Sequence, residues 1–215
     1  GAGAREHALA WRINQSPTLT RLWIAPGNFG TSGIATNLEV DPADVDAVAA
    51  AARTVKADLV VVGPEAPLAG GLADRLALLG VPVFGPSQAA AQIESSKAFA
   101  LELMRTAGVP CPEFHVFHDQ AAALSHLKAN NGPKVVKADG LAAGKGVMIC
   151  ADATEAAAAV RSCMSGQAFG DAGSTVVLEE LLTGPEISVF AFTDGEHIAP
   201  LVAERPGVMT PFIIG

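Results

Sequence analysis

The sequence predicts an α/β protein with an N-terminal parallel sheet and a smaller α+β lobe behind it. Over roughly the first ninety residues, short β-branched runs alternate with Ala- and Leu-rich helical patterns, which is typical of βαβ units. Further along the chain, a strand, a Gly-rich turn and a second strand indicate a different architecture. The 215 residues, 50% of them hydrophobic, are enough for one large or two small domains, and frequent Gly and Pro favour two.

The first part of the chain is interpreted as strands that each end at a Gly/Pro turn. The expected strands are 21–25, 59–62 and 81–84, and the expected crossover helices are 44–54 and 68–79. The carboxyl ends of parallel strands meet at one edge of a sheet, where open α/β sheets bind ligands. We therefore expect Asn28, Glu65 and Ser87 to lie along a candidate binding edge.

A long helix is expected to lead out of this first region. It begins at Ser87, a good N-cap residue, and ends at Ala107 before a glycine and a proline. The elements expected beyond it are strands at 134–138, 147–151 and 175–182, a helix at 154–164, and a hairpin of 187–192 and 197–201 around Asp194-Gly195.

The N-terminal residues place a Gly-rich turn directly before a helical stripe. Such a turn ordinarily follows a strand, so we expect a first strand that lies outside the 215 residues. The dinucleotide fingerprint GxGxxG fails because Glu6 occupies its sixth position, which disfavours an NAD site. Arg5 and His7 could instead bind an anion at the helix N-terminus.

Composition excludes several classes of function. A net charge of −8 leaves no basic surface for nucleic acid, and no apolar run approaches the ~20 residues that span a bilayer. The three cysteines are odd in number and lack CxxC spacing, so a soluble protein of a reducing cytoplasm is expected, without disulfides or zinc. The histidines also lack the spacing of metal ligands, and they are expected at the surface; they are His115, His118, His126 and His197.

The segment 134–147, KVVKADGLAAGKGV, carries the most chemistry. It places Lys137 in a β-branched strand and Lys145 in a Gly-rich loop. Glycines allow backbone amides to approach phosphate oxygens, and two ammonium groups offset phosphate charge, so a nucleotide phosphate site is favoured. It is not a Walker loop, because Gly146 follows the lysine where Ser or Thr is needed. A hairpin turn with two solvated lysines remains open as the alternative.

A second segment offers a complement to these cations. An apolar strand ends at Glu179 and Glu180, and Glu186 follows after a Gly-Pro pair. A strand end exposes backbone groups that can pair with an adenine edge, and a carboxylate can accept hydrogen bonds from ribose hydroxyls. A solvated strand end is the alternative interpretation. Lys97, on the long helix, adds a cation that could face the same cleft.

Seven motifs occur in an order that is more specific than any of them alone. They are GAGAREHALAW at 1–11, APGNFGT at 25–31, DLVVVGPEAPL at 58–68, FGPS at 84–87, ESSKAFA at 94–100, VVKADGLAAGKGV at 135–147 and EELLTGPEIS at 179–188. This series closely resembles the phosphoribosylamine–glycine ligase (GAR synthetase) family of purine biosynthesis, which are ATP-grasp enzymes. The resemblance implies a Rossmann-like substrate domain at 1–93 and an ATP-grasp region at 94–201. The small α+β lobe of that region spans about 113–190.

The resemblance also implies roles for individual residues. Those expected to bind ATP are Lys97, Lys137, Gly144, Lys145, Gly146, Glu179, Glu180, Leu181, Leu182 and Glu186. Among them, the lysines face the phosphates, the two glycines form a flexible flap, 179–182 is the adenine hinge and Glu186 contacts the ribose. Those expected to receive 5-phosphoribosylamine are Gly3, Arg5, His7, Gly27, Asn28, Gly63, Pro64 and Glu65.

The implied reaction joins glycine to 5-phosphoribosylamine through glycyl phosphate, giving glycinamide ribonucleotide, ADP and phosphate. Mg²⁺ or Mn²⁺ is implied in the full-length enzyme, with ligands outside this chain, so no metal site is expected here. The sequence departs from the family at Ala4, which replaces a glycine, at Pro185, which replaces an acidic residue, and over 202–215, an unmatched tail.

We therefore expect an N-terminal fragment without ligase activity. The alternatives are a non-catalytic nucleotide-binding or oligomer-completing fragment, and another ATP-grasp ligase or carboxylase. The oligomeric state is left open.

Overall fold

The computed structural model describes residues 1–201, apart from 131, 133, 143–144 and 167–168. The chain divides into two compact units, residues 1–181 and residues 182–215. Within the described part, no helix combines the length and the apolar character that crossing a bilayer requires.

The first part of the larger unit consists of short strands and helices. Its elements are α1 (Ala4–Ile13), β1 (Trp23–Ile24), the 3-10 helix η1 (Thr31–Gly33), β2 (Thr36–Asn37), α2 (Val45–Thr54), β3 (Val60–Val61), α3 (Glu65–Ala69), α4 (Leu72–Leu78), β4 (Val83–Phe84) and α5 (Gln88–Ser95). β1 pairs in parallel with β2, and β3 pairs in parallel with β4, so the predicted parallel pairing is confirmed. Buried Val62, Leu72 and Leu76 form the core against α2.

The predicted helix 68–79 is wrong in its course. The chain forms α3 and then α4, with a break at Gly70-Gly71, where Gly71 adopts a left-handed conformation with φ of +87°. An α-helix cannot continue through that backbone geometry. The short strand β2 was also not predicted, because two residues carry no alternating pattern.

The predicted long helix 87–107 is likewise two helices. Ser87 caps α5 as predicted, since its Oγ accepts the N–H of Ala90. Ser96 then turns to an extended conformation, and a new helix, α6 (Lys97–Thr106), begins. The Ser96 hydroxyl accepts the N–H of Phe99, so one residue ends the first helix and caps the second.

The rest of the larger unit is an α+β lobe. Its elements are β5 (Phe114–Phe117), α7 (Gln120–Ala129), β6 (Lys134–Ala138), β7 (Val147–Cys150), α8 (Ala153–Met164), the 3-10 helix η2 (Gly170–Gly173) and β8 (Val176–Glu180). The strands form one antiparallel sheet in the order β5-β8-β6-β7. β5 and α7 were not predicted, whereas the strand and helix predictions for β6, β7, α8 and β8 are confirmed within one or two residues.

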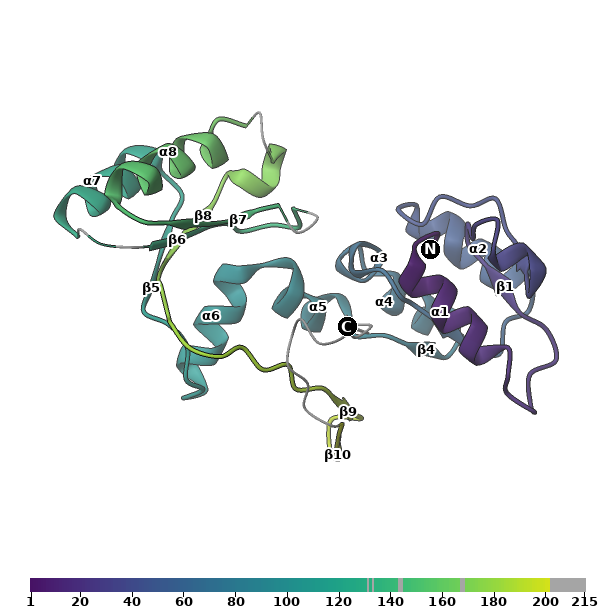
Figure 1. The fold of residues 1–215 in the computed structure, drawn as a ribbon. Helices are drawn as coiled ribbons and strands as arrows, with labels where there is room; N and C mark the ends of the chain where they lie inside the picture. The colour runs from purple at the N-terminus through teal and green to yellow at the C-terminus, as the bar shows by residue number, and fades with distance from the viewer. Residues whose placement is uncertain (131, 133, 143–144, 167–168, 202–215) are drawn as a thin grey trace. The chain divides into compact units, whose positions relative to one another are not determined.

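Helices α7 and α8 cover one face of this sheet (Figure 1). Val136 and Leu178 point to that side and are buried with Val160 of α8. On the opposite face, Leu101 of α6 packs against Phe114 and Val177. The part of that face on β7 stays open, because Val147 and Ile149 are exposed.

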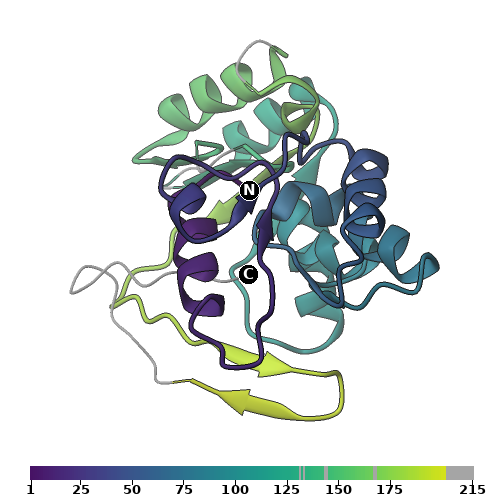
Figure 2. The same cartoon turned by 90° about the vertical axis from the view of Figure 1, so that its right-hand side faces the viewer.

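The smaller unit contains a hairpin of β9 (Ala191–Thr193) and β10 (Ile198–Pro200), whose antiparallel arrows are visible in Figure 2. The hairpin prediction is confirmed, with shorter strands. The Asp194 carboxylate accepts the backbone N–H groups of Glu196 and His197, and these bonds lower its pKa to about 2. Gly195 supplies the positive φ that the turn requires.

Candidate functional site

Strand alternation sorts the charged residues of the lobe onto two faces of the sheet. Lys137 lies opposite Val177 of β8, and Glu179 lies opposite Val135 of β6. Both Lys137 and Glu179 therefore occupy the face that α7 and α8 do not cover. Glu180 follows Glu179 directly and therefore projects to the helix side. Of the two neighbouring glutamates, only Glu179 shares a face with the strand lysine.

Lys137 and Glu179 form a close ion pair, with the ammonium 2.7 Å from Oε2 of the carboxylate. The Glu179 side chain is only 4% exposed, whereas that of Lys137 is 25% exposed. The second carboxylate oxygen, Oε1, is buried and has no hydrogen-bond partner among the described residues. The alternative interpretation, a solvated strand end, therefore does not hold at Glu179, whose carboxylate is buried and has a partner for only one of its oxygens.

Lys97 is the first residue of α6, and its ammonium reaches the loop that follows β6. It donates to the backbone carbonyls of Asp139, at 3.3 Å, and Gly140, at 3.0 Å. Burial is the largest cause that lowers the pKa of Lys97, and the charge of Lys137 lowers it further. The carboxylates of Asp139 and Glu179 act in the opposite direction, so the structure brings Lys97 into the same electrostatic field as the ion pair.

The loop between β6 and β7 carries the remaining predicted phosphate residues. Lys145 is exposed, and its N–H donates to the carbonyl of Ala142. Gly146 is buried, and a Cβ there would lie 2.7 Å from the Cβ of Ala142. Gly146 therefore closes the base of the loop by close packing. Gly144 lies outside the described residues.

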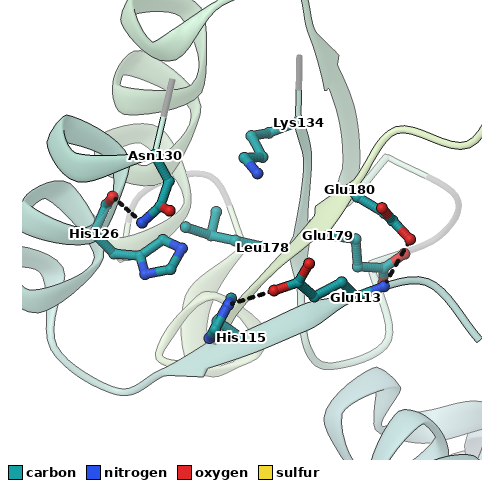
Figure 3. A pocket seen from close by; sticks show the side chains of 8 residues that line it. All are labelled: Glu113, His115, His126, Asn130, Lys134, Leu178, Glu179 and Glu180. Atoms are coloured by element: carbon teal, nitrogen blue, oxygen red, sulfur yellow. Dashed lines mark hydrogen bonds and ion pairs between the residues drawn. The ribbon is translucent and has the colours of Figure 1, made fainter. Parts of the chain in front are cut away.

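On the helix side of the same sheet, Glu180 belongs to a small polar cavity of about 80 Å³ (Figure 3). Its carboxylate accepts the N–H of Glu113 at 3.0 Å, and its own N–H donates to the carbonyl of Glu113. His115 and His126 meet there with ring centroids 4.2 Å apart. Burial, followed by the charges of His115 and Lys134, lowers the pKa of His126. His126 is thus half-buried, not at the surface as predicted, and the Glu180 side chain is engaged away from Lys137.

The remaining predicted nucleotide residues continue the chain after β8. Leu181 is half-buried at the end of the larger unit. Leu182 and Glu186 are exposed and belong to the smaller unit. The structure thus groups Lys97, Lys137 and Glu179, and it describes Leu182 and Glu186 separately.

In the first part of the chain, Arg5 joins α1 to the turn before α3. Its guanidinium donates to Glu65 at 2.9 Å and to Glu6 at 3.2 Å. The hydrogen bond with Glu65 is the main cause that raises the pKa of Arg5. The pKa of the Glu65 carboxyl is lowered, first by a hydrogen bond from its own backbone N–H and then by Arg5. Pro64, in an extended conformation, forms the N-cap that presents Glu65.

Glu6, the residue that breaks the dinucleotide fingerprint, fills the centre of this edge. Its carboxylate accepts the N–H of Gly3 at 2.9 Å, at the N-terminus of α1. A Cβ on Gly3 would lie 2.6 Å from that carboxylate, and one on Gly63 would lie 3.0 Å from the Glu6 side chain. The protein's own carboxylate thus takes the position that a bound anion would use at this helix end.

A compact loop places Asn28 and His7 at the same edge. In the Asn28 side chain, Oδ1 accepts the N–H of Thr31 at 3.0 Å and Nδ2 donates to the carbonyl of Ala2 at 3.0 Å. Gly27 has a φ of +80°, and a side chain there would collide with Asn37. A Cβ on Gly30 would lie 2.2 Å from the His7 ring, so the ring rests on bare backbone. Ser87 is engaged in capping α5.

The sequence predictions missed several residues that build these sites. They are Glu6, Thr31, Asn37, Ser96 and Asp139. Thr31 is fully buried, and its hydroxyl accepts the N–H of Asn28 at 2.7 Å. Asp139 could have been found from its position directly after the β-branched strand that carries Lys137. Thr31 and Asn37 carry no signal in one sequence, because small polar residues in loops are common.

The arrangement at Lys97, Lys137 and Glu179 fits a ligand that carries both negative charge and hydrogen-bond donors. The ammonium groups can neutralise phosphate oxygens, and the unpartnered Oε1 of Glu179 requires an N–H or O–H donor. Adenine nucleotides have both features. No group of three or more His, Cys, Asp or Glu side chains in the described part of the chain is arranged to hold a metal ion.

Comparison with known proteins matches the two parts of the chain in turn. The sequence profile of the phosphoribosylglycinamide synthetase N domain matches residues 1–94, and that of the phosphoribosylglycinamide synthetase ATP-grasp (A) domain matches residues 95–206. Phosphoribosylamine–glycine ligase from Rhodopirellula baltica is 46% identical over 207 residues, covering 94% of this chain and 47% of that protein. The enzyme from Caulobacter vibrioides is 50% identical over 196 residues, covering 91% and 46%.

A solved structure agrees with these matches. The crystal structure of phosphoribosylamine–glycine ligase from Thermotoga maritima superposes with a TM-score of 0.76 at 28% identity, covering 94% of this chain and 48% of that chain. The chain thus spans about half the length of the relatives it matches. With both profiles matching in order over a mixed α/β fold, the chain belongs to the phosphoribosylglycinamide synthetase family, as an N domain followed by part of the ATP-grasp domain.

Proposed function

We propose that this chain supplies the nucleotide-binding half of a phosphoribosylamine–glycine ligase. The reaction joins glycine to 5-phosphoribosylamine at the expense of ATP, giving glycinamide ribonucleotide, ADP and phosphate. ATP lies on the face of the β5-β8-β6-β7 sheet that is opposite to α7 and α8, with its phosphates toward Lys97, Lys137 and Lys145. Residues 179–182 read the adenine, and Glu186 receives the ribose hydroxyls.

The observation that carries this proposal is the state of Glu179. A carboxylate that is 4% exposed, paired on one oxygen and unpartnered on the other is costly to keep in a fold. A bound adenine nucleotide offers phosphates to the accessible ammonium of Lys137. Because Oε1 is buried, its contact with the adenine amino group requires the Glu179 side chain to turn toward the ligand. Both members of the pair then gain partners that they lack without the ligand.

The chemistry needs charge neutralisation and positioning, not a side-chain nucleophile. ATP supplies the phosphoryl group that converts the glycine carboxylate into an acyl phosphate, glycyl phosphate, which the amine of phosphoribosylamine then attacks. The lysines stabilise phosphate oxygens and position the nucleotide. The absence of a nucleophile–base pair from the sequence motifs agrees with this role.

We assign the edge formed by Arg5, His7, Asn28 and Glu65 to 5-phosphoribosylamine. Support comes from the matched N domain and from contacts at the start of α1, where Arg5 donates to Glu65 and the carbonyl of Ala2 accepts the Asn28 side-chain amide. Since Arg5 is already held between Glu6 and Glu65, it presents its remaining N–H groups in a fixed direction. Hydroxyl and phosphate oxygens are the acceptors that such a fork recognises.

We assign Mg²⁺ no site among the described residues, because no group of three or more His, Cys, Asp or Glu side chains there is arranged to hold a metal ion. We propose that the 215 residues bind nucleotide without completing the ligation, since they match about half the length of each relative. A purely nucleotide-binding role, or that of another ATP-grasp ligase, is the competing interpretation.

Calorimetry with ATP, GTP and inorganic triphosphate tests the nucleotide site. ATP is expected to bind more tightly than GTP or triphosphate, and Lys137→Met is expected to weaken ATP about tenfold or more. Lys128→Met, which removes an exposed lysine from α7 on the covered side of the sheet, is the matched control and leaves affinity unchanged. Equal affinity for ATP and GTP, or no binding of either, would refute the assignment.

A further inference from the structure

We propose that Asp139 is a positioning residue for the phosphate-side lysine Lys97, a role that rests on the proposed nucleotide site. Asp139 follows β6 directly and lies where three segments of the lobe meet. Its backbone N–H donates to the carbonyl of Thr175, which precedes β8, and its side chain reaches the start of α6. Asp139 therefore positions Lys97, the start of the loop after β6 and the N-terminus of α6.

The carboxylate of Asp139 occupies the N-terminus of α6. Its Oδ1 accepts the N–H of Ala98 at 2.7 Å, and its Oδ2 accepts the hydroxyl of Ser96 at 3.0 Å. Free N–H groups and the positive end of the helix dipole both favour a negative charge at this point. The break between α5 and α6 is therefore held by a residue some forty positions further along the chain.

The backbone carbonyl of Asp139 also contacts Lys97. The backbone N–H of Lys97 and its ammonium both donate to the carbonyl of Asp139, each at 3.3 Å. The ammonium also donates to the carbonyl of Gly140 at 3.0 Å. These hydrogen bonds join Lys97 to the first two residues after β6.

The negative charge of Asp139 also affects the pKa of Lys97. Burial and the charge of Lys137 lower the pKa of Lys97, and the carboxylates of Asp139, Glu94 and Glu179 oppose them, Asp139 the most. An amide at position 139 would keep an acceptor for Ala98 but would remove the largest of these three opposing charges. The pKa of Lys97 then falls further, and the ammonium loses its charge at a lower pH. Phosphate binding follows, because only the charged form attracts phosphate.

The experiment compares Asp139→Asn with the parent chain by calorimetry with inorganic triphosphate between about pH 6 and pH 9.5. At pH 6, the affinity of Asp139→Asn for triphosphate is expected to be near that of the parent. As the pH rises, the variant is expected to lose affinity before the parent does. The expected effect is a displacement of the affinity profile to lower pH, in the direction of the lowered pKa of Lys97. Asp119→Asn, the same change at the N-cap of α7, is the control and leaves the profile unchanged.

Two measurements separate positioning from a structural defect. In a Lys97→Met background, Asp139→Asn should no longer change triphosphate affinity at any pH, because its effect acts through the lysine. NMR titration of the Lys97 side chain should show the lowered pKa directly, without any ligand. An equal loss of affinity with and without Lys97, or an unchanged Lys97 pKa in Asp139→Asn, would overturn the inference.

These outcomes also distinguish the inference from the proposed function. If the parent chain binds neither triphosphate nor ATP at any pH, the nucleotide site itself is refuted, and the positioning role with it. If the parent binds and Lys97→Met weakens binding while Asp139→Asn matches the parent throughout, only the role of Asp139 is refuted.

Discussion

Replacing only the lysine of the buried ion pair should destabilise the lobe far more than replacing both members of the pair. In Lys137→Met, the Glu179 carboxylate, which is 4% exposed in the parent, loses the ammonium 2.7 Å away, and its other oxygen already lacks a partner among the described residues. Breaking a buried pair costs about 3–5 kcal/mol. Because Lys137 is 25% exposed, water can reach the space it leaves, so we expect a loss near the lower end, about 3 kcal/mol.

The assay is thermal unfolding followed by circular dichroism, together with urea unfolding. A loss of about 3 kcal/mol lowers the melting temperature by about 6–12 °C in a chain of this size. The double variant Lys137→Met/Glu179→Leu should recover to within about 1 kcal/mol of the parent or exceed it, because apolar side chains replace both charges. Recovered stability without ATP binding would show that the pair is kept for the ligand.

An exposed ion pair provides the matched control. Arg75 and Asp46 lie 2.7 Å apart, but their side chains are 46% and 78% exposed, so Arg75→Met should cost no more than about 0.5 kcal/mol. If Lys137→Met costs as little as Arg75→Met, the Glu179 carboxylate is hydrated in solution. The argument from burial, and the support it gives to the nucleotide site, would then fail.

Three further outcomes are expected. Lys145→Ala should weaken ATP about tenfold or more through loss of a charge-assisted contact, and affinity equal to the parent's in calorimetry would refute a phosphate role for the loop lysine. Glu186→Ala should weaken ATP but leave triphosphate unchanged, because a ribose contact does not involve phosphate; equal effects on both ligands would point to a folding defect. The pKa of Asp194 is lowered to about 2, so the hydrogen bonds of its turn are complete above its ordinary pKa of 3.8 and are lost as the pH falls through about 2. The NMR amide resonances of Glu196 and His197 should therefore stay constant down to about pH 4 and shift only in stronger acid.

The sequence was sufficient for elements with strong periodicity or clear punctuation. The β-branched run that contains Lys137 predicted β6 with its observed bounds, and the Asp-Gly pair at 194–195 predicted the hairpin turn. The helix breaks at Gly71 and Ser96 were missed, because apolar spacing continues across both. Each break depends on a backbone angle or a distant partner that local periodicity does not report.

The candidate site was predictable in its residue types but not in its burial. Lys137 and Glu179 were both singled out from the sequence, yet their pairing follows from the β6–β8 register, which one sequence does not determine. The role of Asp139 depends on contacts with Ser96 and Ala98 that are about forty positions away. A single sequence identifies which groups carry charge, whereas only the fold shows which of them lack a partner.

The alternation of β8 has a consequence for how the gene can change. Glu179 faces Lys137 and Glu180 faces the helices because successive residues of a strand point to opposite sides. Inserting one codon immediately before Glu179 would exchange the two glutamates between faces, although every residue type would be retained. Insertions and deletions should therefore be rejected within this strand and accepted in the loops beside it, so the ion pair constrains chain length as well as amino-acid identity.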